Sequence, residues 1–342
     1  MTMLSPTRTD PLPVDRDGLE ALLAALRSAR AEIGQTVLGQ EGIVEQLLIG
    51  LIAGGHVLLE GPPGAGKTLL VKTLAEVTGL SFSRVQFTPD LMPADITGSL
   101  VLTPEADGRN VLKFQPGPIF TQLLLADEIN RATPRTQSAL LEAMQERTVS
   151  AAGTSMALPQ PFCVLATQNP IEMEGTYALP EAQIDRFMFR IDVGYPSAET
   201  LSAILQATTG AEQTVARQVL NPEQILALQA AVRTVPIAEH VRRAVALFAI
   251  ATQPSAPGAS AEVRRFIRFG LSPRGAQALV LAAKAQALFA GRFNVAFEDL
   301  RAVLLPALRH RVQLNFEGIA EGVSLEDLMG KLFEQSVRTV VA

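Results

Sequence analysis

Short apolar runs of strand length recur through the first two hundred residues, each followed by a turn or by a helical pattern. These runs cover residues 56–60, 82–86, 122–126, 162–167 and 187–193. Several are apolar at nearly every position, as is typical of parallel strands covered on both faces. The pattern predicts a five-stranded parallel sheet in an α/β domain.

Helical periodicity flanks these runs and dominates the chain after residue 195. Apolar residues recur at helical spacing over residues 19–33, 40–53 and 68–77. Beyond residue 195 the same spacing predicts helices over residues 199–207, 222–232, 238–252, 273–289, 297–311 and 325–336. We therefore divide the chain into a loose tail (1–16), an α/β core (17–195) and an all-helical C-terminal domain (196–342).

Two further segments have the pattern of hairpins that project from the core. Strand-like runs at residues 98–102 and 111–114 flank Asp107-Gly108, a strong turn dipeptide. Residues 148–158 have the same pattern and turn near Gly153. Projecting segments of this kind are natural places for contact with another molecule, and simple connection explains them as well.

Composition limits the class of protein. With 342 residues, the chain can form two domains with cores of their own. Hydrophobic residues make up 48% of it and aromatic residues only 5%, a balance that suits packed helices. The longest apolar stretch, residues 47–59, is interrupted by glycines and is shorter than the roughly 20 residues of a membrane helix. We expect no membrane span.

The single cysteine, Cys163, excludes an intrachain disulfide. The opening segment lacks the apolar core of a signal peptide, so the reducing cytoplasm is the simplest location. We expect Cys163 to be a small buried side chain within a strand.

Charge gives no general argument for binding nucleic acid, because the formal net charge is −5. Residues 196–342 carry 15 Lys and Arg against 12 Asp and Glu. Their densest basic spots are Arg242-Arg243, Arg264-Arg265 and Arg309-His310-Arg311. Solvated helix faces explain these spots equally well.

A phosphate-binding loop lies between the first predicted strand and the helix at residues 68–77. It fits the pattern G-x-x-x-x-G-K-[ST]. Glycines let backbone N–H groups approach phosphates, Lys67 reaches the outer phosphates, and Thr68 offers an oxygen to Mg²⁺. The candidate nucleotide-binding residues here are Gly61, Pro62, Pro63, Gly64, Ala65, Gly66, Lys67, Thr68 and Leu69. The sequence therefore predicts ATP binding with Mg²⁺.

Polar residues follow two later strands of the predicted sheet. Asp127 and Glu128 end an apolar strand, where Asp127 can orient Mg²⁺ and Glu128 can polarise the attacking water. Asn169 follows the strand at 162–167, and if the two strands are neighbours it lies near the γ-phosphate. An Asp-Glu pair alone usually caps a helix, but a phosphate loop about 60 residues upstream favours catalysis.

Several longer motifs together resemble the MoxR family of AAA+ ATPases. They are the phosphate loop, residues 126–132 (ADEINRA), 136–146 (TQSALLEAMQE), 166–170 (ATQNP) and 181–187 (EAQIDRF). The resemblance covers about residues 30–315. It implies an AAA+ core with a five-stranded parallel sheet, followed by a helical lid domain.

The resemblance also implies roles for the residues already singled out. Lys67 and Thr68 correspond to the Walker A motif, and Asp127 and Glu128 to the Walker B motif. Asn169 corresponds to sensor 1. Val37, Leu38 and Gly39 resemble the segment that packs on adenine in these ATPases.

Two arginines are implied to complete the catalytic site. Arg186, at the start of the last core strand, would be the arginine finger of a neighbouring subunit's site, since an arginine fork suits the charge on a transferring phosphoryl group. Arg131 and Arg135 are rival donors. Arg274 would be sensor 2, following Ser272 and Pro273 at a helix start. Whether Arg274 acts on its own nucleotide or on a neighbour's stays open.

The family resemblance implies an ATP-hydrolysing homo-oligomeric ring, expected to be a hexamer, that remodels or matures protein clients. It further implies a partner with a von Willebrand factor A domain and, often, insertion of metal cofactors into clients. Both hairpins match the family's layout, in which residues 97–116 would be the insert in the second helix and residues 145–161 the hairpin before sensor 1. Two alternatives stay open at this stage: a DNA-acting motor, supported only by the basic spots, and a chelatase-type motor subunit.

Overall fold

The computed structural model describes residues 16–104, 110–151, 153–169, 176–209 and 215–341. A five-stranded sheet lies at the centre of the first domain, in the order β2-β5-β8-β1-β9, and all its pairs are parallel. The strands are β1 (Val57–Glu60), β2 (Phe82–Gln86), β5 (Leu123–Asp127), β8 (Cys163–Gln168) and β9 (Phe189–Asp192). The predicted sheet is confirmed, and each strand lies within about two residues of its predicted position.

Alternate residues of the strands pack into two separate hydrophobic clusters, one on each face of the sheet. In β1, Val57 and Leu59 belong to the larger cluster, and Leu58 belongs to the smaller one. Leu124 of β5 joins the smaller cluster, whereas Leu125 joins the larger. Successive strand residues point to opposite faces, so an apolar residue at every position means that both faces are covered.

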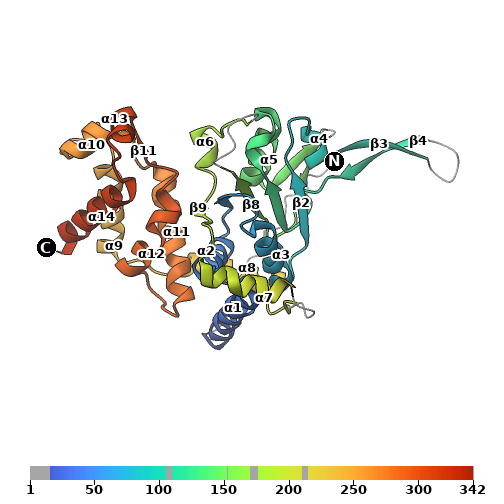
Figure 1. Ribbon diagram of the computed structural model, residues 1–342, viewed down its shortest axis with the longest axis horizontal. Coiled ribbons are helices and arrows are strands. Elements are labelled where there is room, and N and C mark those ends of the chain that lie inside the picture. Colours follow the sequence, from blue (N-terminus) through green and yellow to red (C-terminus); the bar gives the residue numbers. More distant parts are fainter. Residues whose placement is uncertain (1–15, 105–109, 152, 170–175, 210–214, 342) are drawn as a thin grey trace, which may run out of the picture.

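Helices of the core cover these two faces (Figure 1). The larger cluster includes residues of α1 (Arg16–Thr36), α2 (Glu41–Ile52) and α3 (Lys67–Thr78). The smaller cluster includes residues of α4 (Pro93–Thr97) and α5 (Pro134–Glu146). Two short helices, η1 (Ile129–Arg131) and α6 (Glu181–Ile184), adjoin the strand ends. No helix in the described ranges is long and apolar enough to cross a bilayer.

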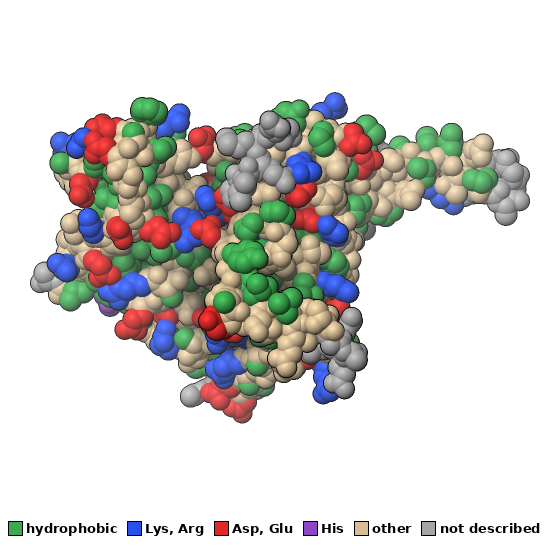
Figure 2. Space-filling model, viewed as in Figure 1, with side chains coloured by type: hydrophobic (Ala, Val, Ile, Leu, Met, Phe, Trp, Pro, Cys, Tyr) green, Lys and Arg blue, Asp and Glu red, His purple; other side chains and the backbone are tan. Residues whose placement is uncertain are grey.

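Both predicted hairpins are present. β3 (Gly98–Pro104) pairs with β4 (Asn110–Pro116), and β6 (Thr148–Ala151) pairs with β7 (Thr154–Ala157), each antiparallel. The predicted turn at Asp107-Gly108 lies outside the described residues. The β3–β4 hairpin projects far from the sheet, and hydrophobic side chains lie along it (Figures 1 and 2). Among them, Leu102 and Leu112 face each other across the ladder and are mostly exposed.

The C-terminal part is helical, as predicted (Figure 1). Its helices are α7 (Ala198–Thr209), α8 (Pro222–Thr234), α9 (Glu239–Ala251), α10 (Ala261–Phe266), α11 (Pro273–Phe289), α12 (Phe297–Leu308), α13 (Phe316–Ala320) and α14 (Leu325–Val341). A small two-stranded sheet of β10 (Ile267–Phe269) and β11 (Gln313–Leu314), not anticipated from the sequence, joins α10 to α13. α8 packs on α1 and α2, so it lies against the core.

Two of the three basic spots of this part are engaged rather than freely solvated. Arg265 forms ion pairs with Glu317 and Glu321 at 2.6 and 2.5 Å. A solvated helix face, one of the two explanations offered for the spot at residues 309–311, does not fit Arg311, whose side chain is only 3% exposed. α12 ends at Leu308, three residues earlier than predicted, and the following turn carries these residues inward.

Candidate functional site

The loop between β1 and α3 curls around the lysine that follows it. Gly64 and Gly66 have positive φ angles of 78° and 79°, a conformation that residues with side chains rarely adopt. Lys67 is the first residue of α3, and its Nζ donates a hydrogen bond to the carbonyl oxygen of Gly61 at 2.6 Å. The amino end of α3 adds partial positive charge. This arrangement suits an anion such as a phosphate group.

Asp127 and Glu128 lie where β5 reaches the carboxyl edge of the sheet, which is the edge that also carries the phosphate loop. Asp127 is buried, and its Oδ1 accepts a hydrogen bond from Thr167 Oγ1 at 2.6 Å. Its Oδ2 accepts from Arg84 Nη2 at 2.7 Å. Because β5 and β8 are paired neighbours, Thr167 reaches across to orient the carboxylate.

Glu128 has a left-handed backbone, with φ of 56°, which is uncommon for a non-glycine residue and is found at functional sites. Its Oε2 accepts a hydrogen bond from Gln86 Nε2 at 2.7 Å and lies 3.2 Å from Arg131 Nε. Its backbone N–H donates to Thr167 Oγ1 at 2.8 Å. The carboxylate is therefore held by residues from β2 and η1.

A cavity of about 300 Å³ joins these parts of the site. It is lined by Pro63, Gly64, Gly66, Lys67, Thr68, Leu69, Asp127, Glu128, Thr167 and Asn169. The structure thus brings together the loop, both carboxylates and Asn169, as expected if β5 and β8 are neighbours. A hydroxyl and a carboxylate oxygen in one cavity fit Mg²⁺, which takes few protein ligands beside phosphate and water. Thr68 and Asp127 are the residues that would hold it.

A second cavity of about 170 Å³ continues from the phosphate loop toward α7. Val37 and Leu38 line it from the core side. Residues that the sequence reasoning missed line it as well, namely Tyr195, Pro196, Leu201, Ile204, Ala207 and Thr208. Gly39 has φ of 69°, and a Cβ there would lie 2.4 Å from a side-chain carbon of Thr200, so α7 packs directly on this segment. Nothing local to residues 195–208 signals this contact.

Arg186 and Arg274 line a different cavity, between the core and the lid. It has a volume of about 300 Å³ and is also lined by Arg147, Asp185 and Arg311. Arg186 is partly buried, and its Nε has no hydrogen-bond partner in the described ranges. Arg274 is exposed at the start of α11. The structure therefore brings the two arginines of the sequence prediction together.

The cavity that Arg186 and Arg274 line lies at the amino edge of the sheet, opposite the phosphate loop. Phe189, three residues after Arg186, pairs with Val57 at the start of β1, whereas the loop begins after Glu60 at its end. Four strand residues span roughly 13 Å. No lining residue of either carboxyl-edge cavity lies beyond Thr208 in the part of the chain that is described. Within one subunit, Arg186 and Arg274 do not reach the phosphate loop.

The rival arginines lie elsewhere. Arg131 is beside Glu128 of its own subunit, at 3.2 Å. Arg135 is exposed in the first turn of α5. Neither lines the amino-edge cavity with Arg186.

Burial sets the protonation of two side chains near the amino edge, namely His56, which lines the cavity there, and Cys163. His56 accepts a hydrogen bond from the backbone N–H of Val164 at its Nδ1, at 3.0 Å, so its Nε2 donates to the Met144 carbonyl at 3.1 Å. Burial lowers the pKa of His56 to about 4. Burial also raises the pKa of Cys163 to about 12, and its side chain is buried in β8 as expected. His56 is therefore a neutral, fixed connector at neutral pH.

Comparison with known proteins finds matches over nearly the whole chain. A family model described as "ATPase family associated with various cellular activities (AAA)" matches residues 56–189, and the AAA lid domain model matches residues 259–331. The chaperone MoxR1 of Mycobacterium tuberculosis is 42% identical over 96% of this chain and 86% of its own length. The protein MoxR of Paracoccus denitrificans is 36% identical over 85% and 89%.

A solved structure agrees with these sequence matches. The crystal structure of a candidate ATPase from Cytophaga hutchinsonii superimposes with a TM-score of 0.86. Its sequence is 38% identical, and the match covers 92% of this chain and 95% of that one.

Proposed function

We propose, since the chain belongs to the MoxR family of AAA ATPases, that it hydrolyses ATP at sites shared between neighbouring copies of itself. Each shared site would combine the carboxyl edge of one subunit with the amino edge of the next. A single observation carries this proposal: the phosphate loop and the pair Arg186 and Arg274 lie at opposite edges of one sheet.

The carboxyl edge supplies the groups for binding and for activating water. Lys67 binds the outer phosphates, and Thr68 and Asp127 hold Mg²⁺. When bound, Mg²⁺ neutralises charge that develops on the transferred phosphoryl group. Glu128 takes the proton of the attacking water, and Asn169 orients that water or the γ-phosphate. Gln86 and Arg131 hold the Glu128 carboxylate in place.

The nucleobase would occupy the second cavity, between the segment at Val37 and Leu38 and helix α7. The side chains of Leu201 and Ile204 provide an apolar surface for a flat ring. Tyr195, at the mouth and mostly exposed, offers a further ring surface. Apolar walls with few polar groups are typical of small-molecule sites.

The amino edge supplies positive charge to the neighbour's nucleotide. Arg186 acts as the arginine finger, and Arg274 acts beside it in trans, because both line one cavity that is remote from their own phosphate loop. A repeated head-to-tail contact of this kind closes into a ring when its rotation permits. We propose a hexameric ring in the cytoplasm.

The work of this ring would be remodelling or maturation of protein clients, with insertion of metal cofactors as one form of it. A protein with a von Willebrand factor A domain is the proposed partner. This part of the proposal rests on the family, since one relative is named a chaperone. The projecting β3–β4 hairpin, with its exposed leucines, is the surface we expect to couple nucleotide state to a client.

Mixing experiments test the shared site. Glu128→Gln should lower kcat by at least about 100-fold while ATP binding persists, because only proton transfer is lost. Arg186→Ala should lower kcat by about 1,000-fold. An equal mixture of the two variants should recover about a quarter of wild-type activity, since a quarter of random head-to-tail contacts pair an intact phosphate loop with an intact finger.

In the matched control, the double variant Arg186→Ala, Glu128→Gln replaces Glu128→Gln in the mixture. The double variant has no arginine finger to supply, so activity should not recover. Arg274→Ala should behave as Arg186→Ala does, with a smaller loss of about 10-fold to 100-fold. A mixture that stays inactive at every ratio, although the subunits co-assemble, would refute hydrolysis at a shared site.

A further inference from the structure

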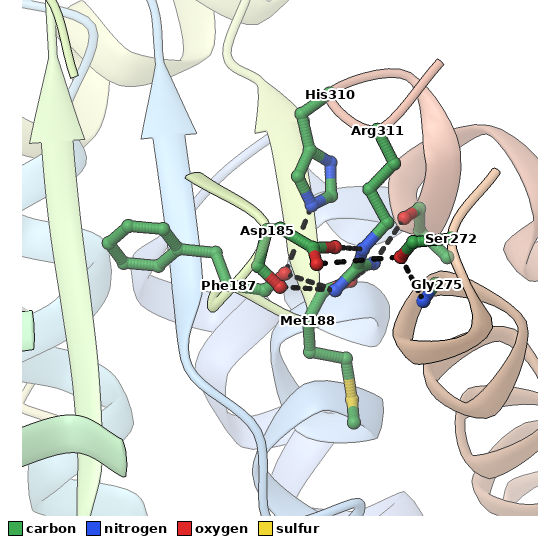
Figure 3. A network of polar contacts seen from close by, with 8 residues as sticks. Asp185, Phe187, Met188, Ser272, Gly275, His310 and Arg311 are labelled. Carbon is green, nitrogen blue, oxygen red and sulfur yellow. Dashed lines mark hydrogen bonds and ion pairs between the residues drawn. The ribbon is translucent and has the colours of Figure 1, made fainter. Parts of the chain in front are cut away.

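The guanidinium of Arg311 donates four of its five hydrogen bonds to the segment that carries Arg186 (Figure 3). Its Nε donates to Asp185 Oδ1 at 2.7 Å. Its Nη2 donates to the carbonyl oxygens of Asp185 at 3.0 Å and Phe187 at 2.7 Å. Its Nη1 donates to the carbonyl oxygens of Met188, at 3.1 Å, and Ala307. All five N–H donors of an arginine are thus used, four of them on residues 185–188.

This contact is buried and specific to arginine. The Arg311 side chain is 3% exposed and that of Asp185 is 23% exposed. Burial lowers the pKa of the Arg311 guanidinium, and the hydrogen bond with Asp185 opposes this shift. A lysine keeps the charge but has three donors on a flexible stem in place of a planar fork. It cannot satisfy the same set of acceptors.

Arg311 also contacts the helix start that carries Arg274. A Cβ at Gly275 would lie 2.9 Å from Arg311 Cδ, so the stem of Arg311 packs against the first turn of α11. Ser272 caps that turn by accepting from the Gly275 N–H at 3.1 Å, and its Oγ lies 3.5 Å from Asp185 Oδ2. One side chain therefore touches both the segment at residues 185–188 and the start of α11.

Arg186 itself is placed by its two neighbours in the chain. The backbone of Asp185 and that of Phe187 both bond to Arg311, whereas Arg186 Nε has no hydrogen-bond partner in the part of the chain that is described. Arg311 belongs to the lid, in the turn after α12, and α12 packs on β9 and on α11. A shift of the lid is thus transmitted to the backbone on both sides of Arg186.

We infer that Arg311 is a positioning residue that fixes Arg186 and Arg274 as one rigid pair across the junction of core and lid. The inference rests on the proposed shared site and deepens it. The lid sets the position of the finger in its own subunit, and through it the rate of hydrolysis in the neighbouring one. The phosphate loop of the same subunit lies at the other edge of the sheet and does not depend on this contact.

Arg311→Lys tests this role through a split between binding and turnover. We expect kcat to fall by about 10-fold, because a finger displaced by a fraction of an ångström loses much of its effect. The Kd for a fluorescent ATP analogue should stay within about twofold of wild type, since the carboxyl edge is untouched. Mixing Arg311→Lys subunits with Glu128→Gln subunits should restore activity, because the second variant supplies a correctly held finger.

A double-mutant cycle with Arg186→Ala separates positioning from general stability. Once Arg186 is absent there is nothing to position, so adding Arg311→Lys should cost less than about a further twofold in kcat. The inference would be overturned if the losses in kcat of the two single variants multiply in the double variant. It would also be overturned if Arg311→Lys alone keeps kcat within twofold of wild type. Should Arg311→Lys fail to fold, Asp185→Asn removes the carboxylate partner and is judged by the same criteria.

Arg292→Lys is the matched control. Arg292 belongs to the same domain and pairs with the buried Asp299, but it does not contact residues 185–188. The substitution Arg292→Lys should lower the midpoint temperature of thermal unfolding and leave kcat of the folded enzyme unchanged. If Arg186→Ala itself leaves kcat unchanged, the shared site fails. If Arg186→Ala behaves as proposed and Arg311→Lys does not, only the role of Arg311 fails.

Discussion

The two edges of the central sheet are assembled in different ways. At the carboxyl edge, the residues that line the phosphate-loop cavity come from short runs of the chain that end or follow strands, at residues 63–69, 127–128 and 167–169. At the amino edge, the arginines come from separate segments, at residues 147, 186, 274 and 311, and two of them belong to the C-terminal domain. The phosphate-loop cavity is built from local motifs, and the amino-edge cavity is built by packing of the lid on the core.

This difference separates two tasks. In the proposed site, the carboxyl edge binds the nucleotide within one subunit, through Lys67 and the apolar cavity beside it. The amino edge, in the same proposal, supplies positive charge to the nucleotide of the neighbouring subunit. ATP affinity and turnover should therefore respond to different mutations, and that contrast can be tested in order of expected effect.

The largest effect is expected at the carboxyl edge, for Lys67→Ala. Loss of the charge that contacts the outer phosphates should weaken ATP binding by at least about 100-fold. Equilibrium titration with a fluorescent ATP analogue measures it. Lys72→Ala, on the exposed side of the same helix, is the control and should bind normally. Undiminished binding by Lys67→Ala would remove the basis for assigning the nucleotide to this edge.

Acid should act on the amino edge through His56, whose folded pKa of about 4 lies below its ordinary value of 6.5. On acidification, the unfolded chain therefore protonates His56 at a higher pH than the folded chain does. The free energy of unfolding keeps its full value above pH 6.5 and falls as the pH drops toward 4. Over this pH range, the free energy of unfolding of the wild type should fall by on the order of 3 kcal/mol more than that of His56→Gln, which has no titrating group at this position. Urea unfolding of both proteins between pH 7 and 4 measures it, and a pH-independent difference would contradict it.

The smallest effect is expected in the nucleobase cavity. Leu201→Ala removes part of the apolar wall that α7 supplies, and it should weaken ATP binding by about fivefold, near 1 kcal/mol. The titration used for Lys67→Ala measures this change. Leu205, exposed on the same helix and outside the cavity, offers the control Leu205→Ala. Equal affinities for the two variants would exclude α7 from the base site.

The strands, the phosphate loop and the carboxyl-edge cluster could be predicted from the sequence. Apolar runs specify buried parallel strands, and the carboxyl ends of such strands meet at one edge of a sheet. Asp127, Glu128 and Asn169 lie at or directly after the carboxyl end of a strand, so they meet Lys67 once β5, β8 and β1 are neighbours, an order that the structure supplies. The pattern also placed both hairpins and most helices of the lid.

Only the tertiary structure decided what α7 and Arg311 contact. Leu201 and Arg311 each lie on segments whose local pattern indicates no more than a helix and a basic turn. The partners of Arg311 at residues 185–188 are 123 to 126 residues away in sequence, and its burial depends on how the lid packs on β9. Backbone periodicity is set by near neighbours, whereas a contact over such a separation is fixed by the packing of whole elements. The sequence therefore determined the nucleotide loop and its carboxylates, and the packing of the lid determined where the arginines stand.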